Sequence, residues 1–309
     1  MTSVVTFYKF VRLTEPARLR DEIDDIAGEL ELKGTILLAE EGINGTLTGA
    51  AAALERFLVA LERFPQFSDL ASKYSSATPS NPVFYRLKVR VKPEIVSFGV
   101  PGLDPGGRTG THVNAEEWNG LLNDPEVTVI DTRNDYEVAI GSFPGAVNPA
   151  TSSFREFAEF VADHLDPERD ARVAMYCTGG IRCEKASAYL LSQGFAEVYQ
   201  LDGGVLKYLE TVKAGENRWH GECFVFDQRV SVDRDLQEGS YEQCFACRRP
   251  LSARDLGSPE YQPGVSCPKC AAEQSEPRRA AFAERARQVA LAARRGGAHI
   301  GAPQPAEKG

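Results

Sequence analysis

Cys177 and the residues that follow it form the part of this sequence best suited to chemistry. The cysteine ends a predicted strand, and the loop Thr178-Gly179-Gly180-Ile181 leads into a helix that we expect to begin near Cys183. Glycines let successive backbone N–H groups turn toward one point, which creates an anion-binding cradle at the start of a helix. A thiolate held there gains about 1–2 kcal/mol. The pKa of Cys177 should therefore fall by roughly one unit toward neutrality.

Arg182 and Cys183 complete the candidate catalytic group. The Arg182 cation favours ionisation of Cys177, so the loop predicts a nucleophilic thiolate that could also carry a persulfide. Cys183 lies in the first turn of the helix and also feels its positive end. It could be the working nucleophile, a partner that forms a disulfide with Cys177, or a residue that only packs. The loop geometry favours Cys177, which lies at the centre of the cradle. A Cys177 that is merely a buried core thiol is disfavoured, because Thr-Gly-Gly makes a poor core and a good cradle.

A second group of cysteines has the spacing of a metal site. Two Cys-x-x-Cys pairs lie 19 residues apart, and four thiolates can close a tetrahedral structural zinc site with no open position for catalysis. Arg248 and Arg249 would offset the negative charge of such a site. The alternative is four reduced thiols packed without metal. The predicted ligands are Cys244, Cys247, Cys267 and Cys270.

Two groups of cations could contact a nucleic acid. Arg86, Lys88, Arg90 and Lys92 alternate with apolar residues, so a strand would place all four on one face, about 6.6 Å apart. The segment 278–295 carries six arginines against one acid, Glu284. A solvated surface is the alternative interpretation of both groups.

Composition limits the class of protein. The net charge of −9 argues against a nonspecific nucleic-acid coat but does not exclude RNA, which needs only a local patch. The apolar runs are far shorter than the ~20 residues of a membrane span, and the first residues do not resemble a secretion signal. We therefore expect a cytoplasmic protein with neither membrane nor DNA as partner, whose seven cysteines stay reduced.

Residues 1–98 are predicted to form a ferredoxin-like α+β domain. Strands at 4–11, 35–39 and 43–48 alternate with helices at 15–30 and 50–63, and a long strand at 84–98 closes the β-α-β-β-α-β order. Residues 99–110 are rich in glycine and proline and predict a linker.

Residues 111–215 alternate strand and helix, which predicts a parallel sheet flanked by helices. The strands are expected at 128–131, 172–176 and 197–201, so Asp131 and Cys177 both fall at carboxyl ends, where ligands bind in such sheets. We expect an ion pair between Asp131 and Arg133, and no catalytic role for Glu184 or Lys185. Residues 216–275 form a Cys-rich segment resembling a zinc ribbon, and 276–309 a basic helix with a tail expected to be disordered after Gly296.

Three motifs in order resemble the rhodanese sulfurtransferases. They are the segment that begins Asp131-Thr132-Arg133, the Cys177-to-Arg182 loop, and Leu201-Asp202-Gly203-Gly204-Val205. Cys183 departs from the common rhodanese pattern, which has Ser or Thr there. The longer string Tyr176–Lys185, with Ala39–Gly45, Phe224–Asp227 and the late paired cysteines, is similar to the bacterial tRNA uridine hydroxylases.

This resemblance implies oxygen-dependent conversion of the wobble uridine of tRNA to 5-hydroxyuridine, with molecular oxygen as co-substrate and the anticodon arm of tRNA as partner. A sulfurtransferase that works through a Cys177 persulfide would use the same loop. A noncatalytic zinc-bearing adaptor is disfavoured because the cradle is intact. A sulfurtransferase needs only the central domain, and this chain is about three times that length, which favours the tRNA-modifying function.

Overall fold

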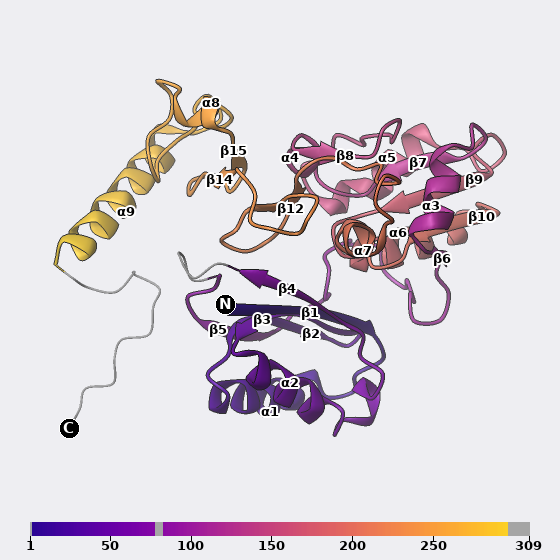
Figure 1. The fold of residues 1–309 in the computed structure, drawn as a ribbon, viewed down its shortest axis with the longest axis horizontal. Helices are drawn as coiled ribbons and strands as arrows, with labels where there is room; N and C mark the ends of the chain where they lie inside the picture. Colours follow the sequence, from indigo (N-terminus) through magenta and orange to yellow (C-terminus); the bar gives the residue numbers. More distant parts are fainter. Residues whose placement is uncertain (1, 78–82, 296–309) are drawn as a thin grey trace.

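The N-terminal sheet is covered by helices on one face only (Figure 1). The computed structural model describes residues 2–77 and 83–295. The sheet has the strand order β4-β1-β3-β2-β5. In chain order its elements are β1 (Thr2–Phe10), α1 (Pro16–Glu29), β2 (Lys33–Ala39), β3 (Gly42–Gly49), α2 (Ala51–Leu61), the 3-10 turn η1 (Pro65–Phe67), β4 (Ser72–Ala77) and β5 (Leu87–Val91).

Alternation along the strands separates the two faces of this sheet. Phe7 and Leu47 are buried in one apolar cluster with Ile23 and Phe57 of the two helices. Side chains at alternate positions must point the other way. The face without helices therefore carries polar groups and is turned toward the central domain (Figure 1).

The predicted strand 84–98 is wrong in length and in place. The strand β5 ends at Val91, and Pro93, which cannot donate a ladder hydrogen bond, follows it. The strand β5 is a fifth strand added to the ferredoxin-like order, and it lies parallel to β2 at the sheet edge. The position at the end of the β-α-β-β-α-β order belongs to β4, which pairs with β1.

The central domain contains the predicted parallel sheet, in the order β6-β10-β9-β7. The strands β7 (Thr128–Asp131), β9 (Arg172–Tyr176) and β10 (Glu197–Leu201) have the predicted bounds. The helix after the cysteine loop begins at Ile181, two residues before the predicted Cys183. The remaining elements are β6 (Thr111–Val113), α3 (Ala115–Leu122), α4 (Asp135–Val138), β8 (Gly141–Ser142), η2 (Phe154–Glu156), α5 (Phe157–His164), α6 (Ile181–Ser192) and α7 (Gly204–Thr211).

A buried ion pair lies at the carboxyl end of β7. Two guanidinium nitrogens of Arg133 donate to the carboxylate of Asp131 at 2.8 and 2.5 Å, and both side chains are buried. The guanidinium also lies over the rings of Tyr176 and Trp219. The predicted Asp131–Arg133 ion pair is therefore confirmed.

The chain beyond the central domain forms short hairpins and one long helix. We call residues 242–275, which contain the four late cysteines, the four-cysteine module. The helix α9 buries none of its side chains, as expected of a basic surface helix. The expected disorder after Gly296 concerns residues outside the described part. None of the described helices is both long and apolar enough to cross a membrane. The elements here are β11 (His220–Gly221), β12 (Cys223–Phe224), β13 (Ser231–Val232), β14 (Glu242–Gln243), β15 (Pro250–Leu251), α8 (Ala253–Leu256) and α9 (Glu276–Arg294).

Candidate functional site

The loop after β9 holds the sulfur of Cys177 in a backbone cradle. The N–H of Gly180 donates to Sγ of Cys177 at 3.1 Å. Gly180 has a φ of 98° and caps the start of α6, a conformation that favours glycine. Gly204 closes the loop from behind, since a Cβ there would lie 2.4 Å from the carbonyl oxygen of Cys177. The geometry therefore depends on glycine at both positions.

The two cysteines of this loop have opposite ionisation tendencies. Burial is the largest influence on Cys177 and opposes its ionisation. It is outweighed by the hydrogen bond from the Cys183 thiol, the Arg182 cation and the backbone N–H groups, so the pKa of Cys177 is well below its ordinary value. Burial and the neighbouring Cys177 raise the pKa of Cys183 well above its ordinary value. These opposite shifts favour the thiolate form at Cys177 and the thiol form at Cys183.

Arg182 is neutralised by a buried carboxylate rather than free to face a ligand. Its guanidinium donates to Glu137 at 2.7 Å and to Thr178 Oγ1 at 3.3 Å. Both members of the ion pair are buried. Arg182 also lies 5.7 Å from the ring centre of Phe226, whose side chain is 64% exposed. Arg182 thus contacts both the cysteine loop, through Thr178, and the ring of Phe226.

The N-terminal domain reaches this loop directly. The ammonium of Lys73, on β4, donates to the carbonyl oxygens of Gly179 at 2.6 Å and Gly203 at 3.0 Å. Tyr8, on β1, donates to Glu184 in the first turn of α6 at 3.1 Å. Sequence reasoning missed Lys73 and Tyr8, because nothing in their own segments indicates a contact with a loop about a hundred residues or more away.

Glu184 and Lys185 join the domains, a role that the sequence did not suggest. Lys185 is 2% exposed and its ammonium lies 2.8 Å from Glu41 and 2.7 Å from Glu94. Glu184 accepts from Tyr8 and from His112 of the central domain, with the His112 contact at 2.9 Å. Two adjacent residues of α6 therefore fix its first turn to the N-terminal domain.

A cavity of about 490 Å³ lies between the helix-free face of the N-terminal sheet and the cysteine loop. Its walls carry hydroxyl and amide groups from three strands, β1, β3 and β4, and an exposed ring from the segment after β12. Residues that line it include Thr6, Asn44, Thr46, Ser75, Val96, Cys177, Thr178, Gly179, Ile181, Arg182, Val225, Phe226, Asp227 and Arg229.

The structure divides the predicted loop residues into two groups. Cys177, Thr178, Gly179, Ile181 and Arg182 line the cavity, whereas Gly180 and Cys183 are not among the lining residues. Cys183 lies in the core below, 3.7 Å from Thr132 Oγ1. Cys177 lies at the bottom of the cavity and is fully buried in this conformation. His220 is exposed on β11 and is not among the lining residues.

Lys88, a member of the predicted cation row, lies on the same sheet face as the cavity. Across the ladder, Thr6 pairs with Thr46, Thr46 with Thr35, and Thr35 with Lys88. Paired residues share a face, so Lys88 is two strands, or about 10 Å, from the cavity wall at Thr46. Burial, and then the cations Arg86, Arg90 and Arg248, lower the pKa of Lys88.

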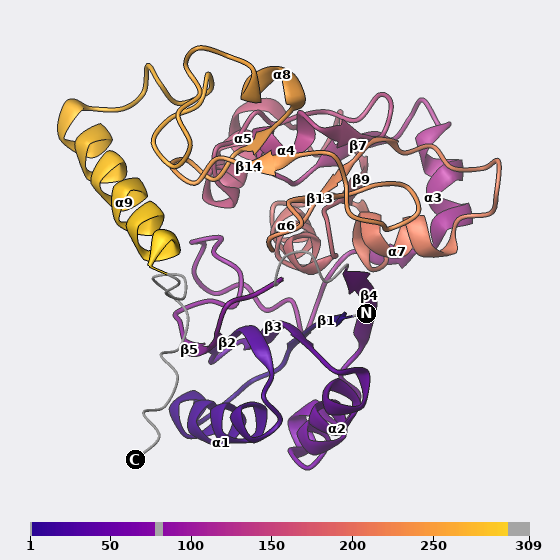
Figure 2. The ribbon, with the colours of Figure 1, turned by 60° about the vertical axis from the view of Figure 1, so that its left-hand side comes forward.

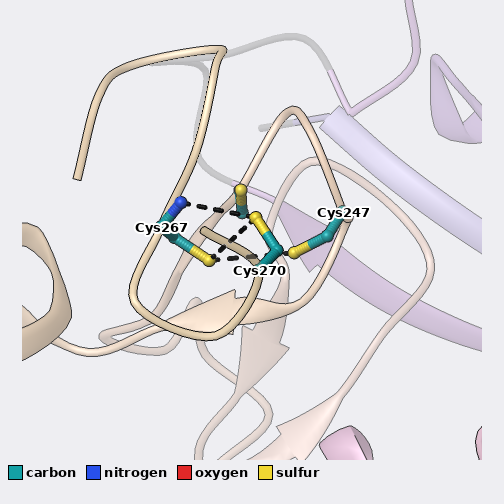
Figure 3. Close-up of side chains that lie close together, drawn as sticks. Cys247, Cys267 and Cys270 are labelled. Carbon is teal, nitrogen blue, oxygen red and sulfur yellow. Dashed lines mark hydrogen bonds between the residues drawn. The ribbon is translucent and has the colours of Figure 1, made fainter. Parts of the chain in front are cut away.

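The four late cysteines converge on one point, and Figure 3 shows Cys247, Cys267 and Cys270 among them. Their sulfur atoms all lie within 4.8 Å of one another. Cys267 Sγ is 3.8 Å from Cys247 Sγ and 3.6 Å from Cys270 Sγ. Four thiolates around zinc, each at about 2.3 Å from the metal, would be about 3.8 Å apart. The residues fit a tetrahedral metal site.

Comparisons with known proteins match both large domains. A family model of a UPF0176 acylphosphatase-like domain matches residues 2–95, and a model of a rhodanese-like domain matches residues 114–211. The predicted fold class is thereby confirmed. The chain is 52% identical to the tRNA uridine(34) hydroxylase of Teredinibacter turnerae over 96% of this chain and 92% of that protein.

Solved structures resemble single domains. The rhodanese-like domain from Anabaena sp. has 21% identity and a TM-score of 0.31, covering 37% of this chain and 80% of that one. The acylphosphatase from Bacillus subtilis has 18% identity and a TM-score of 0.24, covering 29% of this chain and 99% of that one.

Proposed function

We propose, from the premise that the chain belongs to the tRNA uridine(34) hydroxylase family, that it hydroxylates the wobble uridine of tRNA to 5-hydroxyuridine. The observation that carries the proposal within this chain is the position of Cys177. Its sulfur has a lowered pKa and lies at the bottom of a cavity whose other wall is a polar sheet face. A cavity of about 490 Å³ falls within the usual size range of small-molecule pockets.

A uracil base would enter this cavity from a single-stranded loop. Proteins recognise such bases by stacking them on aromatic rings and by hydrogen bonds to their edges. Phe226 offers an exposed ring supported by Arg182, and Asn44 and Thr46 offer polar groups opposite. The cavity therefore has the parts that an extruded pyrimidine needs.

Cys177 is the proposed nucleophile. A thiolate that adds to C6 of the uracil ring makes C5 electron-rich, so that C5 can react with molecular oxygen, the proposed co-substrate. One oxygen atom stays on C5, and the other leaves as water with two electrons and two protons from an external reductant. Loss of the remaining C5 proton then breaks the C6–S bond and releases the Cys177 thiolate. Because Cys177 is buried, the loop must turn its sulfur toward the base, and the space around Gly179 is open. Cys183 and Arg182 are proposed to stabilise the thiolate, and Cys183 is the alternative nucleophile.

The remaining parts are assigned to substrate binding and structure. The row Arg86, Lys88, Arg90 and Lys92 is proposed to contact tRNA phosphates beside the cavity. The four-cysteine module is proposed to bind one structural Zn²⁺, which holds the two Cys-x-x-Cys turns together when bound. We also propose a cytoplasmic location. For the domains we propose the bounds predicted above, 1–98, 111–215 and 216–275, with a linker at 99–110 and a basic helix and tail at 276–309.

Mass spectrometry of tRNA nucleosides tests this function. Cells that lack the gene should lose 5-hydroxyuridine derivatives, and the wild-type gene, but not the Cys177→Ser variant, should restore them. Unchanged nucleosides, together with thiocyanate formation from thiosulfate and cyanide by the purified protein, would instead support the sulfurtransferase.

A further inference from the structure

A second cleft, of about 660 Å³, lies between the N-terminal domain, the four-cysteine module and α9. The helix α9 lies at the end of the molecule where β5 forms the sheet edge (Figure 2). The cleft is lined by three arginines from three separate segments, together with aromatic and small apolar residues. No Asp or Glu is among its described lining residues. The arginines are Arg86, Arg248 and Arg285.

These arginines differ from many cations of this acidic protein in their lack of a carboxylate partner. Within residues 2–77 and 83–295, no ion pair involves Arg86, Arg248 or Arg285. Their neighbours are paired: Arg249 with Glu273 at 2.9 Å and Arg287 with Glu284 at 2.8 Å. Unpaired cations that crowd one cleft favour an anionic ligand.

An aromatic ring stands among these cations. Phe245, inside the first Cys-x-x-Cys turn, is 44% exposed and lines the cleft. The Arg248 guanidinium lies 5.5 Å from its ring centre, and Arg285 donates to its carbonyl oxygen. Exposed aromatic rings among cations are typical of surfaces that bind single-stranded nucleic acid, because bases stack on the ring while phosphates meet the cations.

The cleft continues into the cation row that leads to the cavity. Arg86 lines the cleft and directly precedes β5. From Arg86 to Lys92 a strand extends about 20 Å. Beyond it, Ile95 accepts a hydrogen bond from Asn44 at 3.0 Å, and Val96 lines the cavity of Cys177. A bound strand that followed the row would have one end in the cleft and the other at the cavity.

We propose that this cleft is an RNA-binding site for a single-stranded stretch of tRNA next to the nucleotide in the cavity. Arg86, Arg248 and Arg285 bind its phosphates, and Phe245 stacks on one of its bases. The four-cysteine module is then a substrate-binding element rather than only a structural one. This inference rests on the proposed function, since it takes tRNA as the substrate.

The test is the affinity of the full-length, zinc-loaded protein for a fluorescent tRNA anticodon stem-loop, measured by anisotropy over a range of salt concentrations. Arg248→Gln with Arg285→Gln should weaken binding about tenfold or more and lower the salt slope by about two, one for each lost phosphate contact. Phe245→Leu should weaken binding about tenfold with an unchanged slope, because stacking releases no counterions.

The matched control is Arg287→Gln, which removes a paired arginine from the same helix and should leave both affinity and slope unchanged. Zinc content and melting temperature confirm that each variant is folded. If a variant loses zinc, Arg285→Gln alone, outside the module, should still weaken binding several-fold. Wild-type tRNA affinity and salt slope in the folded variants would overturn the proposal. Binding to phosphatidylserine vesicles is measured in parallel, and variants that lose vesicle binding but keep tRNA binding would overturn it as well.

The outcomes for this site and for the reaction are separable. If the wild type forms 5-hydroxyuridine and the cleft variants bind tRNA normally, the cleft proposal fails and the proposed function stands. If the variants lose tRNA affinity but the wild type makes no 5-hydroxyuridine, the binding site stands and the reaction fails.

Discussion

Cys177 and Cys183 in the central domain differ from the four cysteines of the four-cysteine module in what their sulfur atoms face. The sulfur of Cys177 faces backbone N–H groups and a neighbouring thiol, which lower its pKa. The other four face one another within 4.8 Å. A sulfur surrounded by hydrogen-bond donors is favoured as a nucleophile, whereas four sulfurs around one point can hold a metal ion. The residue type alone does not decide between them.

The largest expected effect is that of Cys177→Ser. Activity should fall on the order of 1000-fold or more, because a hydroxyl is nearly isosteric but far less ionised than this thiol. The melting temperature should change little. The measurement is 5-hydroxyuridine formed in tRNA by purified protein, with folding followed by circular dichroism. Full activity in the serine variant would remove Cys177 from the reaction.

Replacing Cys244 and Cys247 with serine tests metal binding by the four-cysteine module. The purified wild type should contain about one zinc per chain and the double variant none, since two thiolates cannot hold a structural site. The central domain should stay folded, with Cys177 still reactive. Elemental analysis and alkylation measure the two effects. The control is Cys223→Ser, a buried cysteine outside both groups, which should keep its zinc.

A smaller effect separates the two cysteines of the loop. Cys183→Ala removes the hydrogen bond that helps to lower the pKa of Cys177, so this pKa should rise. A thiol is mostly ionised only above its pKa, so the alkylation profile should move to higher pH. Cys183→Ser keeps a donor and should retain most activity. If instead Cys183→Ser is as inactive as Cys177→Ser, our order of the two cysteines is wrong.

The smallest effect on cysteine chemistry is expected from the cation row. Lys88→Glu with Arg90→Glu should weaken tRNA binding about tenfold or more and flatten its salt dependence. Alkylation of Cys177 should remain at the wild-type rate, because neither residue contacts the cysteine loop. Unaltered affinity and salt slope would mean that the row is only a solvated face.

Regular patterns made much of the fold predictable. The strands β7 and β9 are short apolar runs between turn signals, and both were placed correctly by sequence. The strand β4 was missed because Ser72–Ala77 is mostly polar and lies at a sheet edge, where no apolar alternation is needed. The strand β5 was extended too far, since the apolar pattern continues past Pro93 while the ladder does not.

The candidate site was predictable only as far as local sequence determines it. The glycines around Cys177 predicted the cradle, and Cys-x-x-Cys spacing predicted the convergence of the late cysteines. The partners of the loop were not predictable, because Lys73 and Glu137 reach it from segments far away in the chain. The arginine-rich segment was likewise predicted as one patch, whereas Glu284 neutralises Arg287 and Arg285 lines the second cleft.

The contacts of Lys185 have a consequence for how this protein can change over evolution. Its ammonium lies between Glu41 and Glu94 of the N-terminal domain, and leaving such a buried charge unpaired costs about 3–5 kcal/mol. A substitution that removes one of these carboxylates would leave the charge buried, and a central domain transferred alone would lose both of them together with the Lys73 contact to the cysteine loop. We therefore expect the two domains to be inherited as one unit, with substitutions at their junction compensated across it.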